Sequence, residues 1–157
     1  MHAQHEPLLR KIGKGDMEEK TSYTIFPVGI IHRSDNVSSI EIFNEYQDAL
    51  QGLDQFSHII ILSWFHENDK EEKRKTLRVY PRGDRKNPLT GVFATRSPIR
   101  PNLVAFFTSR IISIKGNIIK IEDINALEGS PVIDIKPYIP YQDCIQNAVT
   151  PEWLKRK

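Results

Sequence analysis

The sequence predicts a mainly β domain, a small closed β-barrel with one short helix. Short apolar segments rich in isoleucine and valine recur along the chain, and glycine, proline, asparagine or aspartate residues separate them. Apolar residues at convincing helical spacing occur only in residues 44–53. We expect the sheet to close into a barrel, because closure removes the exposed edges that an open sheet leaves.

The expected strands are short and regularly interrupted. Pro27 indicates an edge or a bulge in the first of them, and Gly116 with Asn117 joins the two arms of the clearest hairpin, residues 103–124. The run SHIIILSWFH is apolar enough for burial on both faces of a strand. We expect strands in residues 23–32, 39–43, 57–66, 76–81, 91–95, in both arms of 103–124, and in 130–138.

Two polar segments complete this description. In the helix expected at residues 44–53, Asn44 provides the cap and Gly52 lies near the end. The stretch ENDKEEKRK, residues 67–75, carries dense charge of both signs, which is typical of a solvated loop between strands.

Length, charge and cysteine content limit the possible functions. The 157 residues fit one domain, residues 23–157, after a polar N-terminal tail at residues 1–22. The net charge of only +2 does not by itself predict a nucleic-acid binder, so any RNA contact would be local. The single cysteine, Cys144, excludes an internal disulfide and a cysteine-based zinc site. Without an apolar run of membrane length or a secretory signal, we expect a cytoplasmic protein.

The strand expected in residues 57–66 ends in a histidine. The period of two places His66 on the same face as Trp64, so the imidazole would emerge at the strand end. A histidine in such a place is most often an ordinary hydrogen-bonded residue, and a functional role is the alternative.

The segment GVFATRSPIRPN carries two arginines around a stiff turn. Arg96 would continue the face of the preceding strand, and Pro98 and Pro101 would stiffen the loop that carries Arg100 and Asn102. Planar donors held rigidly suit a carboxylate, a phosphate or a purine edge. The alternative is a pair of arginines in surface salt bridges.

The segment LEGSPVIDIKPY combines a glycine turn with two charged residues. Asp134 and Lys136 share one face of the expected strand, where they could form a structural ion pair or act on a ligand. The turn is not a dinucleotide or Walker loop, since neither G-x-G-x-x-G nor G-x-x-x-x-G-K occurs. Motifs of serine hydrolases and zinc proteases are absent too. From the residues alone, we predict a β domain with a polar pocket.

Several motifs resemble those of a known family. In chain order they are VGIIHRS, IEIFNEYQDALQGLDQFSHIIILSWFH, GVFATRSPIRPN, EGSPVIDIKPYIPYQD and TPEWL. Together they resemble the TsaA-like family of small β-barrel methyltransferases, over about residues 26–154. Bacterial members methylate a threonylcarbamoyl-modified adenosine in tRNA with S-adenosylmethionine.

The resemblance implies an S-adenosylmethionine pocket and a homodimer that completes or borders it. The implied cofactor-binding residues are His66, Arg96, Arg100, Asn102, Phe106, Leu127, Glu128, Gly129, Ser130 and Tyr138. The implied catalytic residues are His66, Asp134 and Lys136, and no metal is expected. The chemistry agrees, because a guanidinium can meet the carboxylate of the cofactor and Glu128 can offset its amine or sulfonium charge.

The role of each catalytic candidate stays open at this point. Transfer to a nitrogen that an adjacent carbonyl acidifies needs a nearby base, which could be His66 or Asp134. Lys136 could instead neutralise an anionic acceptor. The alternative function is an S-adenosylmethionine-binding barrel that acts on a small molecule or has no catalytic activity. The segment HRSDNVSSIEIF favours this alternative, since it lacks the longer proline and glutamine loop of typical members.

A tRNA substrate would require local basic residues for its phosphates. Two charged loops and the end of the chain supply them. The candidates are Lys70, Lys73, Arg74 and Lys75, then Arg78, Arg82, Arg85 and Lys86, and finally Lys155, Arg156 and Lys157.

Overall fold

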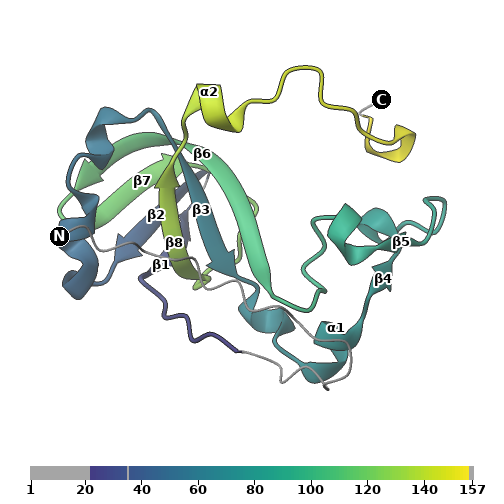
Figure 1. The fold of residues 1–157 in the computed structure, drawn as a ribbon. Helices are drawn as coiled ribbons and strands as arrows, with labels where there is room; N and C mark the ends of the chain where they lie inside the picture. Colours follow the sequence, from purple (N-terminus) through teal and green to yellow (C-terminus); the bar gives the residue numbers. More distant parts are fainter. Residues whose placement is uncertain (1–21, 35, 156–157) are drawn as a thin grey trace, which may run out of the picture.

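A computed structural model describes residues 22–34 and 36–155. Six strands close into an antiparallel barrel in the order β1-β2-β7-β6-β3-β8 (Figure 1). They are β1 (Gly29–Ser34), β2 (Val37–Ile42), β3 (His58–Trp64), β6 (Val104–Lys115), β7 (Ile118–Glu122) and β8 (Pro131–Pro137). The predicted mainly β fold with a closed barrel is therefore confirmed. The expected tail lies outside the described residues except for Ser22.

The barrel interior is filled almost entirely by β-branched side chains. Those with no exposed surface are Ile31, Ile40, Ile59, Ile61, Ile119, Ile121 and Val132. Where one strand contributes two of them they are two residues apart, as the alternation of side chains along a strand requires. Each such burial contributes about 1.5–3 kcal/mol. The strand ends that carry the candidate site are thus anchored in a well-packed core.

The first strand begins at a glycine that permits barrel closure. Gly29 pairs with Ile42 of β2 on one side and with Val132 of β8 on the other. A Cβ atom on Gly29 would lie 2.3 Å from the carbonyl oxygen of Glu41, far inside van der Waals contact. Only glycine therefore allows the three strands to approach as they do. The first strand starts later than expected, so Pro27 precedes the sheet and marks no bulge in it.

The segment expected as the single helix forms two shorter elements. They are the 3₁₀ helices η1 (Asn44–Leu50) and η2 (Leu53–Gln55). Gly52 separates them because its backbone is left-handed, with φ of 83°, which ends a helical segment. No side-chain cap forms at the start of η1, so the predicted capping by Asn44 is wrong.

The connection from β3 to β6, residues 65–103, is here called the excursion. It contains η3 (His66–Asn68), α1 (Glu71–Lys75), β4 (Arg78–Val79), η4 (Pro81–Gly83), β5 (Thr90–Gly91) and η5 (Val92–Ala94). Figure 1 shows its outer part, with β4 and β5, standing away from the barrel. The strands expected at 76–81 and 91–95 are therefore reduced to a separate two-stranded ribbon.

The charged stretch expected as a loop contains the short helix α1. Glu71 and Glu72 occupy its first turn, and Lys73, Arg74 and Lys75 occupy its last. This order of charges favours the helix dipole, and Lys75 pairs with Glu71 one turn earlier at 2.5 Å. The dense charge thus stabilises a helical turn, which the loop interpretation overlooked.

The chain after β8 returns toward the excursion. It forms α2 (Pro140–Asp143) and η6 (Glu152–Leu154), and Trp153 and Leu154 help to line a cleft whose other residues belong to the excursion. In Figure 1 this segment runs from the top of β8 across to the side of β4 and β5. Among the described residues, no helix combines the length and apolarity that crossing a bilayer requires.

Candidate functional site

Six of the twelve predicted site residues belong to segments at one end of the barrel. Trp64, the last residue of β3, pairs with Val104, the first of β6, and Ser63 pairs with Val132 near the start of β8. The segments that precede β6 and β8 therefore flank the segment that follows β3. His66, Asn102 and the turn at residues 127–130 all belong to these segments.

His66 was expected to continue the face of β3 that carries Trp64, but it does not. The backbone of Phe65 leaves the extended region, with φ of −76° and ψ of 65°, and the chain enters η3. The half-buried His66 ring has a completely buried Nδ1 atom without a hydrogen-bond partner in the described structure. An unsatisfied buried polar atom costs about 1–3 kcal/mol. Because this nitrogen has no exposed surface, a ligand can bond to it only after the segments around His66 move.

Arg96 belongs to a loop and not to a strand. The expected strand at 91–95 gives way to η5, after which hydroxyl groups hold the backbone. The Thr95 hydroxyl accepts a hydrogen bond from the Ser97 N–H at 3.2 Å, and the Ser97 hydroxyl accepts one from the Ile99 N–H at 3.1 Å. The guanidinium of Arg96 lies over the ring of Phe106, 5.5 Å from its centre. The stiffness expected of the loop with the two arginines thus has a local cause in these hydroxyl contacts.

Arg100 and Asn102 follow on the same loop with different surroundings. The guanidinium of Arg100 is half-buried and donates to the Val92 carbonyl at 3.3 Å, so it is tied to its own loop. Asn102 is exposed. Arg100 is therefore the more internal of the two arginines, and Arg96 is the more accessible.

A contact that the sequence analysis missed holds this loop in place. Arg74 of α1 donates to the Pro101 carbonyl at 3.0 Å and to Asp69 at 2.8 Å, and it lies 5.3 Å from the centre of the Trp64 ring. Trp64 also donates to Asp69 at 3.1 Å. The hydrogen bonds from Arg74 and then from Trp64 hold the pKa of Asp69 below its ordinary value. Arg74 was expected to meet phosphate, but these contacts engage it within the protein.

The turn before β8 is fixed to β1. Gly129 has φ of 74°, and its N–H donates to the Ile31 carbonyl at 2.9 Å. The Ile31 N–H donates in return to the carbonyl of the buried Ser130, also at 2.9 Å. This left-handed geometry favours glycine. The turn presents Leu127 and Glu128, both exposed, at the end of the barrel.

Glu128 already has partners on β1. Its carboxylate accepts from the Arg33 N–H at 2.5 Å and from Nδ1 of His32 at 3.0 Å, and the Arg33 bond is the main cause that lowers its pKa. His32 also contacts Glu41 through Nε2 at 3.1 Å. Both ring nitrogens must donate to reach two carboxylates, which only the protonated imidazole can do. The hydrogen bond to Glu128 accordingly raises the pKa of His32.

The remaining candidates lie farther along β8. Asp134 and Lys136 form an ion pair at 2.6 Å, and this bond raises the pKa of Lys136. Asp134 and Phe106 both pair with Leu62 of β3 from opposite sides, so one row crosses three strands. The Tyr138 N–H donates to the carbonyl of His58. His58 lies at the far end of β3, about 20 Å from Trp64 at 3.3 Å per residue. A single chain therefore does not bring Tyr138 to His66.

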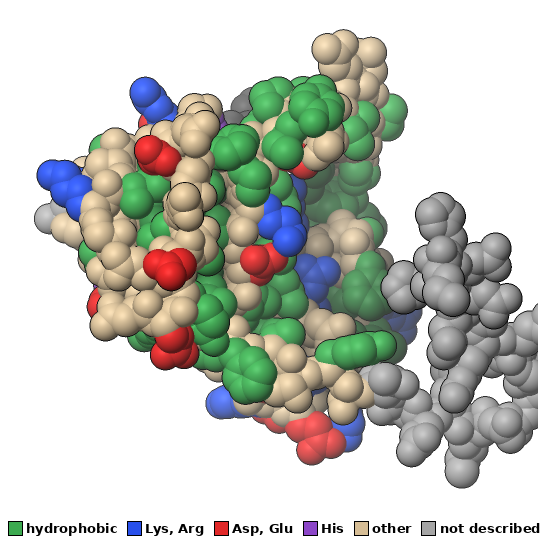
Figure 2. Space-filling view, turned by 60° about the vertical axis from the view of Figure 1, so that its left-hand side comes forward, with side chains coloured by type: hydrophobic (Ala, Val, Ile, Leu, Met, Phe, Trp, Pro, Cys, Tyr) green, Lys and Arg blue, Asp and Glu red, His purple; other side chains and the backbone are tan. Residues whose placement is uncertain are grey.

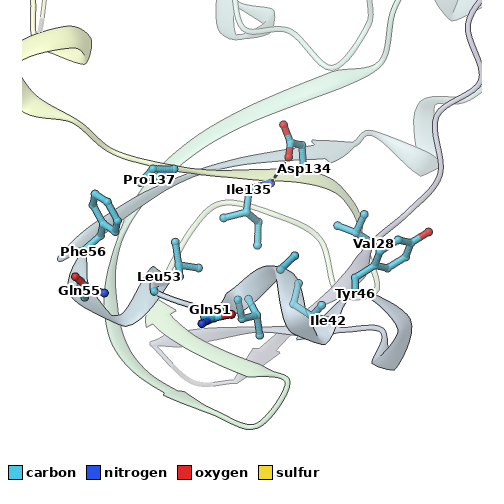
Figure 3. Close-up of a pocket in the computed structure, with 13 residues that line it drawn as sticks. Val28, Ile42, Tyr46, Gln51, Leu53, Gln55, Phe56, Asp134, Ile135 and Pro137 are labelled. Atoms are coloured by element: carbon cyan, nitrogen blue, oxygen red, sulfur yellow. Dashed lines mark hydrogen bonds between the residues drawn. The ribbon is translucent and has the colours of Figure 1, made fainter.

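Two hollows lie near these residues. One, of about 1130 Å³, includes Arg96 in its lining. The other, of about 460 Å³, lies between η1, η2 and β8 and includes Asp134. Figure 3 shows Ile135 pointing into this second cavity and the carboxylate of Asp134 pointing away from it. The second cavity is mainly apolar, and Asp134 is its single predicted site residue.

The exposed surface mixes charged and apolar side chains. Phe106 is 44% exposed and Ile112, farther along β6, is 50% exposed. On the face drawn in Figure 2, basic and acidic side chains lie among hydrophobic ones. Arg156 and Lys157, two of the predicted phosphate contacts, lie outside the described residues.

Comparison with known proteins gives a consistent set of relatives. The family model of the tRNA-methyltransferase O N-terminal domain matches residues 22–144. A probable S-adenosyl-L-methionine-binding protein of Methanocaldococcus jannaschii is 48% identical over 122 residues, which are 78% of this chain and 97% of the relative. A human tRNA (adenine(37)-N6)-methyltransferase is 40% identical over 110 residues, which are 70% of this chain but 24% of the human protein.

Solved structures agree with the fold. The crystal structure of TrmO from Pseudomonas aeruginosa matches with a TM-score of 0.64 and 27% identity, over 82% of this chain and 62% of the solved chain. Another TrmO crystal structure matches with a TM-score of 0.66 and 28% identity, over 83% of this chain and 64% of the other. The chain thus spans less than two thirds of these solved proteins.

Proposed function

The chain belongs to the tRNA-methyltransferase O N-terminal domain family, and we propose that it is an S-adenosylmethionine-dependent N-methyltransferase that acts on tRNA. The acceptor we propose is threonylcarbamoyl-modified adenosine. The observation that supports the proposal is that the segments carrying His66, Asn102 and the turn at 127–130 are neighbours at one barrel end, in a chain that is 40% identical to a tRNA methyltransferase over 110 residues.

The chemistry of these residues fits the cofactor. The half-buried imidazole of His66 makes no side-chain hydrogen bond within the described residues and can bond to a polar group, and the accessible guanidinium of Arg96 can pair with a carboxylate. Gly129 leaves open space where any other residue would place a Cβ atom. The residues that would hold the cofactor are His66, Arg96, Arg100, Asn102, Phe106, Leu127, Glu128, Gly129, Ser130 and Tyr138. When bound, S-adenosylmethionine supplies an activated methyl group on its sulfonium.

The contribution of the protein is then alignment, exclusion of water and removal of one proton. We assign the proton to the half-buried imidazole of His66, because this ring makes no side-chain hydrogen bond within the described residues. Asp134 is a weaker candidate, since Lys136 and the Ile135 N–H already bond to its carboxylate. Lys136 keeps its positive charge through this pair and suits the carboxylate of a threonylcarbamoyl group.

We also propose a homodimer. The distance between Tyr138 and His66 within one chain supports it, because a second copy could bring its own Tyr138 to the cofactor. The exposed Phe106 and Ile112 on β6 offer apolar surface for such a contact. A single-chain mass in light scattering at micromolar concentration, with the cofactor present, would contradict this proposal. A cytoplasmic location follows from the proposed substrate.

A second function is supported by the names of several relatives. Proteins from Methanocaldococcus jannaschii and Archaeoglobus fulgidus are described as S-adenosyl-L-methionine-binding proteins, the first as probable. β1 and β2 are joined by a very short connection, in place of the longer loop of typical family members. A barrel that binds the cofactor and transfers nothing to tRNA is therefore the alternative.

One experiment separates these functions. Radiolabelled methyl transfer from S-adenosylmethionine is measured into bulk tRNA from cells that lack the protein, alongside calorimetric titration of the cofactor. We expect incorporation into an adenosine of the anticodon loop, and a loss of about 10²-fold or more in kcat for His66→Gln, as removal of a general base predicts. Lys120→Gln, an exposed change on β7, is the matched control. Tight cofactor binding without any incorporation would support the non-catalytic barrel.

A further inference from the structure

The cleft that contains Arg96 has a composition that the cofactor site does not explain. It lies between the excursion and the C-terminal segment and has a volume of about 1130 Å³. Its lining includes three arginines and three aromatic residues, and no aspartate or glutamate of residues 22–34 and 36–155. The six are Tyr80, Arg82, Arg85, Phe93, Arg96 and Trp153. We call this the arginine cleft.

Phe93 is held in a position that exposes its ring, while Trp153 is half-buried. Phe93 is the middle residue of η5. Its side chain is 82% exposed, although the preceding residue of the same helix, Val92, is buried. The Val92 N–H donates to the Leu77 carbonyl at 3.0 Å, which fixes this backbone. Because the Phe93 ring is exposed, it contributes little to the stability of the fold through burial. Its ring is available for a flat, apolar partner.

Two arginines of the lining are held by local contacts of their own segment. Arg85 lies over the ring of Tyr80, 5.8 Å from its centre. Arg82 has a left-handed backbone with φ of 60°, next to Gly83 with φ of 71°, and the Asn87 side chain supports this turn by donating to the Pro81 carbonyl at 2.9 Å. A non-glycine residue in this region is strained and persists only where its surroundings enforce it. The turn thus directs a cation into the cleft at an energetic cost.

Cations beside flat apolar rings suit single-stranded nucleic acid. Bases stack on aromatic rings while guanidiniums meet the phosphates, and this combination binds unpaired strands with little dependence on sequence. Arginine and aromatic residues are also enriched in protein interfaces, so a second copy of the chain is the alternative occupant, and a change of molecular mass would reveal it. Arg96 borders the cleft and also lies over Phe106. The cleft therefore adjoins the proposed cofactor site.

We propose that the arginine cleft binds the unpaired nucleotides that flank the methyl acceptor. Their bases stack on Phe93 and Trp153, and their phosphates contact Arg82 and Arg85. The assignment rests on the proposed function, since it places the acceptor strand next to the methyl donor. It adds a recognition site built jointly by the excursion and the C-terminal segment.

Binding of a short RNA tests the stacking contacts. Fluorescence anisotropy with a labelled hexamer of adenylate is measured on the full chain, with S-adenosylmethionine present, at several salt concentrations. We expect Phe93→Ala and Trp153→Ala each to weaken hexamer binding about fivefold or more and to leave its salt dependence unchanged. Tyr141→Ala is the control, because Tyr141 is 83% exposed and lies outside the cleft.

The phosphate contacts have a different signature. The double variant Arg82→Gln with Arg85→Gln should reduce the slope of log affinity against log salt by about 1.4, since each contact to a single strand contributes about 0.7. Lys115→Gln with Lys120→Gln removes two exposed charges from the β6–β7 hairpin and should leave hexamer binding unchanged. All variants should bind S-adenosylmethionine within twofold of the parent protein.

Two results of the binding experiments would overturn the proposal. One is that both aromatic variants bind the hexamer as tightly as the parent protein. The other is that the cleft variants bind RNA like the parent but differ from it in molecular mass by light scattering, which would make the cleft an interface between copies. Failure of the proposed function looks different, because the parent would transfer no methyl group to tRNA while the cleft variants still lost hexamer binding. If every cleft variant transferred methyl groups to tRNA at the parental rate, the RNA-binding role of the cleft would be rejected and the proposed methyltransferase function would stand.

Discussion

Replacing Arg74 with alanine should loosen the loop that carries Arg100 and Asn102. The change removes three contacts, to Asp69, to the Pro101 carbonyl and to the Trp64 ring. A partly exposed ion pair contributes about 0.2–1 kcal/mol, an exposed cation–π contact about 0.5–1 kcal/mol, and a hydrogen bond about 0.5–1.5 kcal/mol. Together these predict a loss of about 2 kcal/mol in the free energy of unfolding.

This loss is large enough to measure. For a chain of this size it corresponds to a fall of about 4–8 °C in the unfolding midpoint, which calorimetry can detect. Cofactor affinity should fall about tenfold, because binding must then order the loop again at about 1–2 kcal/mol per residue. Arg74→Lys should recover only part of both losses, since an ammonium lacks the planar donors that reach Asp69 and Pro101 together.

Arg78→Ala provides the matched control for this prediction. Arg78 is exposed on β4, and within residues 22–34 and 36–155 its side chain makes no hydrogen bond or ion pair. The two variants remove the same charge from neighbouring parts of the excursion. Equal unfolding midpoints and equal cofactor affinities for the two variants would refute the structural role of Arg74.

Three further changes test separate parts of the molecule. Arg96→Ala should weaken S-adenosylmethionine binding in calorimetric titration by about 1.5–3 kcal/mol, the value of a charge-assisted contact, and unchanged affinity would remove Arg96 from the site. The raised pKa of His32 stabilises the fold fully below its ordinary value of 6.5, and this stability is lost as pH rises through the higher folded value. The free energy of unfolding of His32→Gln in urea should therefore depend less on pH above 6.5 than that of the parent, and parallel pH curves would contradict this. Gly29→Ala should prevent barrel closure or lower the unfolding midpoint strongly, since its Cβ would meet Glu41; a native-like circular dichroism melt would show that β1 can shift.

The barrel was predictable because its signals are local. The continuous isoleucine run of β3 is buried on both faces, the alternating Ile119 and Ile121 of β7 mark one buried face, and Gly116 marks the hairpin turn with φ of 58°. The excursion was less predictable, because β4 and β5 are only two residues long and depend on each other. At residue 66 the strand pattern continued in the sequence while the backbone had already turned at Phe65.

The site could be predicted in composition but not in its internal contacts. Both Arg96 and Phe106 were predicted, and the structure adds that the Arg96 guanidinium lies 5.5 Å from the centre of the Phe106 ring. The role of Arg74 depends on Pro101, which is 27 residues away in the chain, and local charge patterning could not reveal it. Its spacing from Asp69, five residues earlier, was the one available signal.

The excursion joins two strands that are direct neighbours in the barrel. About 40 residues connect β3 to β6, where a hairpin loop of about five would be enough. The entropy of loop closure grows only with the logarithm of length, so the longer connection costs about 2 kcal/mol more. The barrel therefore tolerates insertions and deletions in the outer part of this segment, around β4 and β5, at small thermodynamic cost. This outer part can consequently change while the isoleucine core and the segments that carry His66 and Arg96 stay the same.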